Sequence, residues 1–199
     1  MDGTAWDERY RSRDLVWGVE PNRFLAEEAA DLPPGRALDL ACGEGRNALW
    51  LAGRGWQVTG ADFSGVAIDR ARSLAAERGL EVDWVEADVV GWEPPPEVFD
   101  LVILFYLHLP AAQRRQVMSH AEAALAPGGT LLVVGHDSTN IADGYGGPQA
   151  PAVLYGPDDL VADLEGLVIE RAERVTRQVS TEAGERTAID VLVRARRES

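Results

Sequence analysis

The sequence predicts an α/β fold built on a doubly wound, mostly parallel sheet. Short apolar segments alternate with segments of helical periodicity between residues 36 and 135, as strands joined by crossover helices do. A glycine turn, Gly43 to Gly45, follows the first apolar segment directly. Two segments of strand character, 168–175 and 188–195, flank a polar turn near the end of the chain, which predicts an antiparallel hairpin.

The first part of the chain contains a leading segment, a short helix and the first strand–helix–strand unit. Residues 1–20 carry aromatic side chains among charges and show no regular pattern. Residues 21–31 predict a short helix with Pro21 near its start, and the sequence LPPG at 32–35 ends it. Residues 37–41 predict a strand, 47–52 a helix, and 57–61 a second strand that ends at Asp62.

The middle of the chain continues the alternation. Residues 65–79 predict a helix with Ser64 as its N-cap and Gly79 as its stop. Residues 82–86 predict a third strand, followed by Asp88, and the three prolines at 94–96 predict a loop. Residues 99–105 are nearly continuously apolar, which is typical of a strand that is buried on both faces.

The last part predicts the rest of a seven-stranded, Rossmann-like sheet with a C-terminal antiparallel hairpin. Residues 110–126 predict a helix, and Pro127-Gly128-Gly129 predicts a turn into a strand at 130–135. Residues 136–156 predict a long loop, and Gly156-Pro157 opens a short helix at 158–164. Because no composition shift marks a boundary within the 199 residues, we expect a single domain.

Composition limits the function classes. The net charge of −14 argues against a nucleic-acid partner, because phosphate binding depends on Lys and Arg, although a local basic patch would still permit RNA. No apolar run approaches the roughly 18 residues of a membrane span, and the polar N-terminus has no signal-peptide core. With a single cysteine, Cys42, this predicts a cytoplasmic protein with no membrane partner.

The glycine turn and the acids around it predict a site for a nucleoside-bearing cofactor. Gly43, Gly45 and Ala48 give the spacing G-x-G-x-x-A, in which the glycines permit a tight turn and close backbone approach. Asp62 ends the second strand, where an acid can accept hydrogen bonds from ribose hydroxyls. Asp39 lies inside the first strand and needs a partner if it is buried. These features alone leave both a nicotinamide and an S-adenosyl cofactor open.

Four motifs in order resemble those of class I S-adenosylmethionine (SAM)-dependent methyltransferases: LDLACGEGRN, VTGADFS, VEADV and LAPGGTLLV. The resemblance is close over residues 36–135. The leading WDERY and LVWGVEPNRFL and the GRNALWLA helix are similar to the small-molecule branch that contains tellurite-resistance and thiopurine methyltransferases. This resemblance implies SAM as the cofactor and S-adenosylhomocysteine as its product.

The resemblance also implies roles for individual residues. Asp39 would hold the methionine amino group, through the backbone or a water. Gly43 and Gly45 would pass under the methionine and ribose, Asp62 would take the ribose hydroxyls, and Phe63 would lie against the adenine.

Further along the chain, the resemblance implies contacts to the adenine and to the reactive methyl group. Asp88 would accept the adenine amino group beside the backbone of Val89. Phe105 and Tyr106 would flank the methionine end and the methyl. Arg46 and Asn47, which follow the turn directly, would contact the carboxylate of the cofactor.

Within the single domain, 1–199, we expect four parts. Residues 1–35 form an N-terminal cap segment, 36–135 the cofactor-binding core, 136–156 a lid or substrate loop, and 157–199 the terminal helix and hairpin. Trp17 would present its ring to the sulfonium cation, or the aromatic residues of this segment pin it to the core. In the lid, Tyr145 is a possible substrate contact, and a tolerated surface insertion is the alternative.

We therefore predict an enzyme that transfers a methyl group from SAM to a small molecule with an S, O, N or metalloid nucleophile, as a monomer or homodimer. Methylation of a hydroxyl acceptor would be faster with a general base, and the candidates are Tyr106, His136 and His108. The scattered histidines match no metal-ligand spacing. The alternatives are an NAD(P)-dependent oxidoreductase and a non-catalytic SAM-binding protein.

Overall fold

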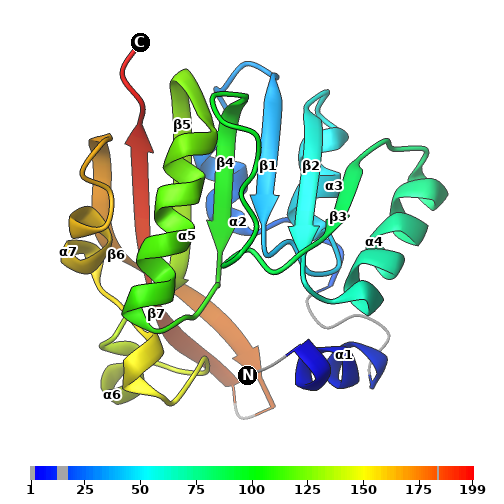
Figure 1. Cartoon of the computed structure of the whole chain (residues 1–199). Coiled ribbons are helices and arrows are strands. Elements are labelled where there is room, and N and C mark those ends of the chain that lie inside the picture. The colour runs from blue at the N-terminus through cyan, green and yellow to red at the C-terminus, as the bar shows by residue number, and fades with distance from the viewer. Residues whose placement is uncertain (1–2, 13–17, 183) are drawn as a thin grey trace.

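A computed structural model describes residues 3–12, 18–182 and 184–199 of the chain. Helices lie on both faces of a central sheet (Figure 1). In chain order the elements are α1 (Gly3–Arg11), α2 (Arg23–Glu28), β1 (Arg36–Leu40), α3 (Arg46–Ala52), β2 (Gln57–Asp62), α4 (Gly65–Arg78), β3 (Asp83–Glu86), β4 (Phe99–Phe105), α5 (Ala111–Ala124), β5 (Leu125–His136), α6 (Asn140–Asp143), the 3-10 helix η1 (Pro151–Val153), α7 (Pro157–Ala162), β6 (Val168–Thr181) and β7 (Gly184–Arg196).

The described residues form a seven-stranded sheet in the order β3-β2-β1-β4-β5-β7-β6. The pairs β2–β3, β1–β2, β1–β4 and β4–β5 are parallel. The terminal hairpin adds two antiparallel pairs, β5–β7 and β6–β7. This confirms the predicted fold class. The strand order reverses between β1 and β4, and ligands of such sheets bind outside the carboxyl ends of the strands at that point.

The central strand β4 is buried on both faces, as its continuous apolar run predicts. Leu101 and Ile103 pack into the core that contains α2 and α3. Val102 and Leu104 pack into the core on the other face, against residues of α5 and α7. Side chains alternate between the faces of a strand, so β4 contributes side chains to the hydrophobic cores on both faces of the sheet.

The structure corrects the predicted turn at Pro127-Gly128-Gly129, which lies inside β5 rather than before it. Leu125 already pairs with Phe99, and the register shifts before Leu101 pairs with Thr130. The extra residues are accommodated as an irregularity in the ladder, where Gly128 has a φ of 79°. A Pro-Gly-Gly sequence is therefore compatible with the start of a strand when a bulge absorbs it.

Other departures concern length and local helix. The hairpin strands β6 and β7 are 14 and 13 residues long, beyond the predicted spans. The predicted loop 136–156 contains α6 and η1. The N-terminal helix α1 was not predicted, because its residues show no clear apolar stripe.

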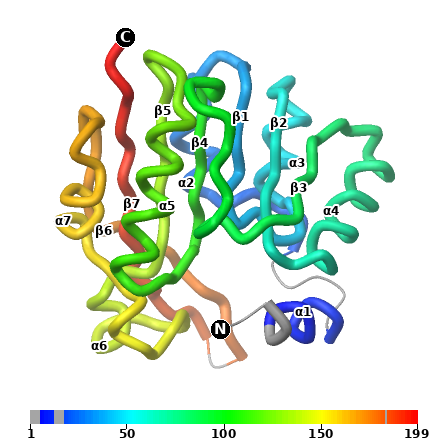
Figure 2. The backbone as a smooth tube through the Cα atoms, in the orientation of Figure 1, coloured from blue at the N-terminus to red at the C-terminus, as the bar shows by residue number. Residues whose placement is uncertain are grey.

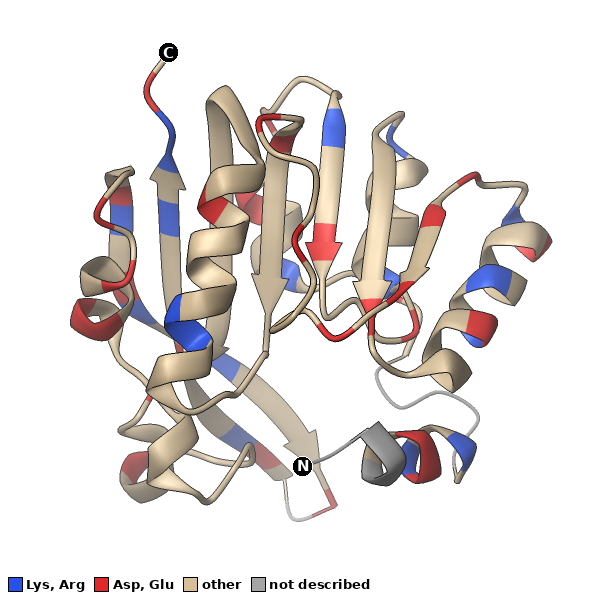
Figure 3. Cartoon of the chain, in the orientation of Figure 1, with Lys and Arg blue, Asp and Glu red and all other residues tan. Residues whose placement is uncertain are grey.

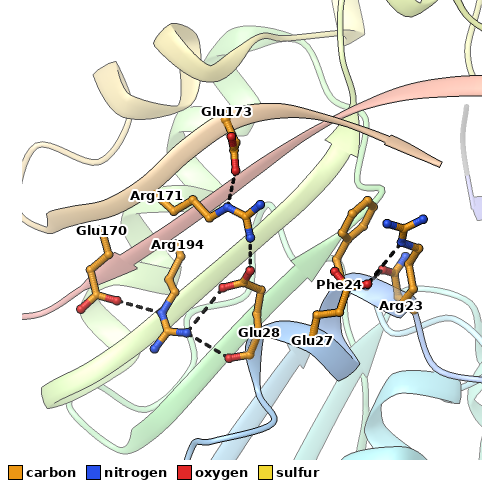
Figure 4. Close-up of polar contacts among 9 residues, drawn as sticks. Arg23, Phe24, Glu27, Glu28, Glu170, Arg171, Glu173 and Arg194 are labelled. Atoms are coloured by element: carbon orange, nitrogen blue, oxygen red, sulfur yellow. Dashed lines mark hydrogen bonds and ion pairs between the residues drawn. The ribbon is translucent and has the colours of Figure 1, made fainter.

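An ion-pair network fixes α2 to the terminal hairpin (Figure 4). The carboxylate of Glu28 contacts Arg171 on β6, and it also lies 3.5 Å from Nη1 of Arg194 on β7. Nε of Arg194 lies 2.8 Å from Oε2 of Glu170. The network joins the helix that precedes β1 to the last two strands, which holds the terminal hairpin against α2.

Helix α1 lies below the carboxyl ends of the parallel strands (Figure 2). It is tied there by the hydroxyl of Ser64, which donates a hydrogen bond of 2.5 Å to Oδ1 of Asp7. Acidic positions occur near the arrowheads of β1 and β2 at the same edge of the sheet (Figure 3). This edge is where the candidate site is assembled.

Candidate functional site

The glycine turn and the acid that ends β2 form one hydrogen-bonded unit. The amide of Gly43 donates to Oδ2 of Asp62 at 2.9 Å, and the amide of Ser64 donates to Oδ1 at 2.9 Å. Burial raises the pKa of Asp62, whereas these two backbone hydrogen bonds lower it. A carboxylate oxygen accepts more than one hydrogen bond, so Asp62 retains acceptor capacity beyond these two contacts.

Gly45 needs to be glycine for reasons of packing and backbone conformation. It is the N-cap of α3 with a φ of 78°, a region that L-residues adopt at a cost. A Cβ there would lie 2.4 Å from Cη2 of Trp84 and 3.0 Å from Cβ of Ala71. The ring of Trp84 therefore lies directly against the turn.

Asp39 is a buried carboxylate with an unsatisfied oxygen. The residue is 1% exposed, and its Oδ2 has no hydrogen-bond partner among the described residues. Burial and, to a smaller extent, the charge of nearby Asp62 raise the pKa of Asp39 to about 8. The hydrogen bond from the backbone amide of Ala48 and the charge of Arg46 act in the opposite direction. A cationic group beside Oδ2 would satisfy this oxygen and restore the charged form. The residues present thus fit the ammonium group of SAM.

The two residues predicted to contact the cofactor carboxylate lie at the start of α3. Oδ1 of Asn47 accepts a hydrogen bond of 2.9 Å from the amide of Asn22, so it ties the leading segment to the turn. Arg46 is largely buried, and burial is the main cause that lowers its pKa, while Tyr106 and Asp39 raise it. Arg46 therefore lies within electrostatic range of both the glycine turn and the end of β4.

The predicted adenine contacts follow β2 and β3. Phe63 is half-buried and comes directly after β2. Asp88 is exposed and its Oδ1 accepts a hydrogen bond of 3.0 Å from the amide of Val90. Val89 buries its side chain in the core, with 3% exposed, so its backbone is the part that a ligand can reach.

At the end of β4 the chain turns sharply into a polar cluster. Phe105 is buried, and Tyr106 after it has a φ of 58°, which is strained for a non-glycine residue. The Tyr106 hydroxyl donates a hydrogen bond of 2.8 Å to Oδ2 of Asp190. Burial and the charge of Asp190 raise the pKa of Tyr106 to about 12. The tyrosine is therefore a neutral hydrogen-bond donor in the physiological range.

His136, at the end of β5, lies in the same cluster. Its ring centroid is 5.1 Å from that of Tyr106, and its Nδ1 is 3.1 Å from Oδ1 of Asp190. Nε of Arg177 on β6 lies 2.7 Å from the other oxygen of Asp190. The structure thus brings the two predicted catalytic candidates together on one carboxylate.

Asp190 and Arg177 were missed by the sequence analysis. Asp190 is an acid within the apolar run of the last strand and is completely buried, the same signal that singled out Asp39 in β1. Arg177 lies in a strand of alternating polar residues, where nothing in the sequence distinguishes it. Only the pairing of β5 with β7, which places His136 opposite Asp190, reveals the cluster.

The loop after β5 closes over this cluster. The ring of His108 stacks on His136 with centroids 5.2 Å apart, and burial is the main cause that lowers the pKa of His108 to about 4. A Cβ on Gly147 would lie 2.6 Å from Cδ2 of His136, so the loop backbone contacts the imidazole. Tyr145 is 44% exposed. Trp17 lies outside the described residues.

This arrangement is a Rossmann-like domain with a buried polar cluster at the same edge of the sheet as its glycine turn. A family model described as "Methyltransferase domain" matches residues 37–129. A curated relative, the demethylmenaquinone methyltransferase of Thermus thermophilus, is 37% identical over 123 residues, which cover 61% of this chain and 54% of the relative. The chain thus spans about half the length of this curated relative.

Solved structures share the fold over nearly the whole chain. A structure titled "Conversion of a Disulfide Bond into a Thioacetal Group during Echinomycin Biosynthesis" is 27% identical with a TM-score of 0.78 and covers 98% of this chain and 91% of its own. TehB of Haemophilus influenzae is 19% identical with a TM-score of 0.76, and the match covers 89% of this chain and 62% of TehB. The N-methyltransferase NodS of Bradyrhizobium japonicum, solved with S-adenosylhomocysteine, is 21% identical with a TM-score of 0.73, covering 100% of both.

Residues 37–129 thus match a methyltransferase domain, and the similar proteins support the predicted resemblance to class I SAM-dependent methyltransferases, with SAM as the cofactor. The likeness to TehB agrees at the level of fold with the predicted tellurite-resistance resemblance. In the part of the chain that the structure describes, no helix has the length and apolar character needed to cross a bilayer.

Proposed function

We propose that the protein transfers a methyl group from SAM to a small-molecule acceptor and releases S-adenosylhomocysteine. The observation that carries this proposal is the unpartnered Oδ2 of buried Asp39 beside the glycine turn. A buried carboxylate is retained when a cation satisfies it, and the methionine part of SAM supplies an ammonium group. In a nicotinamide site the same oxygen would face no comparable cation.

The remaining cofactor contacts in the proposal are those that the family resemblance implies for side chains at this edge of the sheet. Asp62, which is oriented by Gly43, accepts hydrogen bonds from the ribose hydroxyls. Phe63 packs on the adenine, and Asp88 with the backbone of Val89 contacts its amino edge. Gly45 shapes the turn against Trp84, and Arg46 and Asn47 at the start of α3 face the cofactor carboxylate.

The acceptor binds on the β4, β5 and β7 side of the cofactor. Phe105 and Tyr106 flank the methyl group, and His136 faces the acceptor. SAM supplies an activated methyl group bound to a sulfonium. The protein aligns the acceptor with that methyl and excludes water from it.

We propose the same four parts as functional units: a cap at 1–35, the core at 36–135, a lid at 136–156 and the terminal segment at 157–199. The contact of Gly147 with His136 supports the lid, because it places the loop backbone on a candidate catalytic side chain. The net charge of −14 supports a small molecule rather than a nucleic acid as the acceptor. The single cysteine supports a cytoplasmic location.

Calorimetric titration with SAM, S-adenosylhomocysteine and NAD tests the proposed cofactor site. We expect both S-adenosyl ligands to bind with one site per chain and NAD to give no heat above dilution. Transfer of label from methyl-labelled SAM to a panel of phenol, amine, thiol and metalloid acceptors then tests turnover. Binding of NAD without SAM would overturn the proposal, and SAM binding without transfer to any acceptor would indicate a non-catalytic SAM-binding protein.

A further inference from the structure

Asp190 stands out because it is completely buried and yet contacts three polar side chains from three elements. Its Oδ2 lies 2.8 Å from the Tyr106 hydroxyl and 2.7 Å from Nε of Arg177. Its Oδ1 lies 3.1 Å from Nδ1 of His136, and both atoms are buried without a hydrogen bond of good geometry. Because buried polar atoms are normally paired, each of these two atoms is the partner within reach of the other.

This contact determines which nitrogen of His136 carries the proton. Oδ1 of Asp190 is an acceptor, so Nδ1 of the imidazole must be the donor. Nε2 is then the unprotonated nitrogen of the neutral ring. A carboxylate that holds Nδ1–H in this way orients the ring and stabilises the imidazolium that forms when Nε2 takes a proton.

Arg177 balances the charge of Asp190. Nε of Arg177 lies 2.7 Å from Oδ2. Burial raises the pKa of Asp190, but the hydrogen bond of His136, the charge of Arg177 and the hydrogen bond of Tyr106 lower it, and the net shift is downward. Arg177 and His136 therefore contact different oxygens of the same carboxylate, which leaves Nε2 of His136 for the acceptor.

We propose that His136 is the catalytic general base, that Asp190 is its positioning residue, and that the acceptor of methyl transfer is consequently a small molecule with a hydroxyl group. This inference rests on the proposed function. Thiols, selenols and metalloid nucleophiles are soft or ionise close to neutral pH, so they need no built base, and a neutral amine attacks through its own lone pair and loses its proton only after the transfer. A hydroxyl holds its proton at neutral pH, and its attack on a methyl group gains from a base about 10²–10⁴-fold.

The step balances without any further reactant. A lone pair of the acceptor oxygen forms a bond to the methyl carbon, and the sulfur–methyl bond breaks with its electron pair going to sulfur. The sulfonium becomes the neutral thioether of S-adenosylhomocysteine. The hydroxyl proton passes to Nε2 of His136 and then to solvent.

The titratable and charged groups around His136 come from each element that packs on it. Tyr106 and His108 follow β4, Arg177 comes from β6 and Asp190 from β7. Burial, and then His136, lower the pKa of His108 to about 4, and burial raises that of Tyr106 to about 12. Both neighbours are therefore neutral near pH 7, which leaves His136 as the base of the cluster.

The tautomer of His136 tests the inference without any acceptor. The chain has three histidines, so a nitrogen-15 correlation spectrum of their imidazoles is simple, and His136→Gln assigns the signal. We expect the Nδ1–H tautomer at His136 at pH 7.5, and at least a tenfold shift toward Nε2–H in Asp190→Asn. Asp163→Asn is the matched control, because it removes a buried aspartate that pairs with Arg114 at 2.6 Å. An Nε2–H tautomer in the wild type, or no shift in Asp190→Asn, would overturn the inference.

Kinetics with a matched pair of aryl acceptors, one with a hydroxyl and one with a thiol on the same ring, test the acceptor class. We expect His136→Gln and Asp190→Asn to lower kcat for the hydroxyl about 100-fold with little change in KM. Thiol methylation should change less than threefold. Equal losses for both acceptors, or methylation of the thiol alone by the wild type, would contradict the inference.

Titration of each variant with SAM separates this inference from the proposed function. SAM affinity within threefold of the wild type in His136→Gln and Asp190→Asn is expected, because neither residue lies in the glycine turn. If the wild type itself fails to bind SAM, the proposed function fails. If SAM binds and the tautomer is wrong, only the role of His136 and Asp190 fails.

Discussion

The amide of Gly43 donates a hydrogen bond to Oδ2 of Asp62 at 2.9 Å, across 19 residues of the chain. Asp62 is thereby oriented before any ligand arrives, and the first strand, the turn and the second strand form one rigid unit. Preorganisation of this kind lowers the entropic cost of binding. The relationship also explains why burial, which raises the pKa of Asp62, is opposed by two backbone donors.

The raised pKa of Asp39 predicts that SAM binding releases a proton. With a pKa of about 8, Asp39 is mostly protonated at pH 7, whereas a bound ammonium group favours the charged form. Binding should release about one proton at pH 7 and progressively less above pH 8. Calorimetry in buffers of different ionisation enthalpy measures this number. A release that persists unchanged in Asp39→Asn would contradict the assignment.

The same carboxyl predicts how the stability of the ligand-free protein depends on pH. The pKa of Asp39 is about 8 in the folded state and about 3.9 in the unfolded chain, so the folded state binds more protons between these values. Stability should therefore fall as pH rises from about 4 to 8, with a slope approaching about 1.4 kcal/mol per pH unit from this group. Urea unfolding at several pH values measures the slope.

Asp39→Asn should remove the pH dependence of stability that comes from this carboxyl group. The wild type should therefore lose unfolding free energy relative to the variant as pH rises. Asp69→Asn is the control, because its side chain is 79% exposed on α4. A stability difference between wild type and Asp39→Asn that stays constant from pH 4 to 8 would show that Asp39 ionises normally.

Gly45→Ala should destabilise the protein more than Gly79→Ala does. Both positions have positive φ, 78° and 63°, which costs an L-residue about 1–2 kcal/mol. A Cβ at Gly45 also meets Trp84 at 2.4 Å, whereas nothing lies within 4 Å at Gly79. Overpacking adds about 1–3 kcal/mol, so we expect a total of about 2–5 kcal/mol at Gly45. Equal losses of unfolding free energy would show that Trp84 yields without cost.

Cys42 should resist alkylation in the folded protein. It is 8% exposed, and burial, Asp39 and Asp62 all raise the pKa of its thiol, so little thiolate forms at pH 8. We expect labelling by iodoacetamide to be at least tenfold slower than in urea-unfolded protein. Rapid labelling of the native protein would point to a reactive cysteine in the turn.

The cofactor half of the molecule was predictable because its signals are local. The glycine spacing, the acids Asp39 and Asp62, and the apolar run of β4 each lie within a few residues of one another. Capping of α4 by Ser64 and Gly79 is confirmed by a hydrogen bond of 3.2 Å from the Ala67 amide to the Ser64 hydroxyl and by a φ of 63° at Gly79. Such features depend on backbone conformation and short-range sequence alone.

The acceptor side was predictable only in part. Tyr106 and His136 follow strands and were identified, but Asp190 contacts Tyr106 across 84 residues. That contact depends on the antiparallel pairing of β5 with β7 and on its register, which no local pattern encodes. Gly45 against Trp84 is a similar case, since the glycine turn does not reveal which side chain fills the space beside it.

Calorimetric titration of SAM into the wild type and Asp62→Ala is the sharpest test of the proposed cofactor site. The variant removes the acceptor that Gly43 orients, so we expect no measurable SAM binding, while Asp69→Ala, an exposed charge on α4, should bind as the wild type does. Circular dichroism would verify that Asp62→Ala is folded. Unchanged SAM affinity in folded Asp62→Ala would contradict the account of the cofactor site.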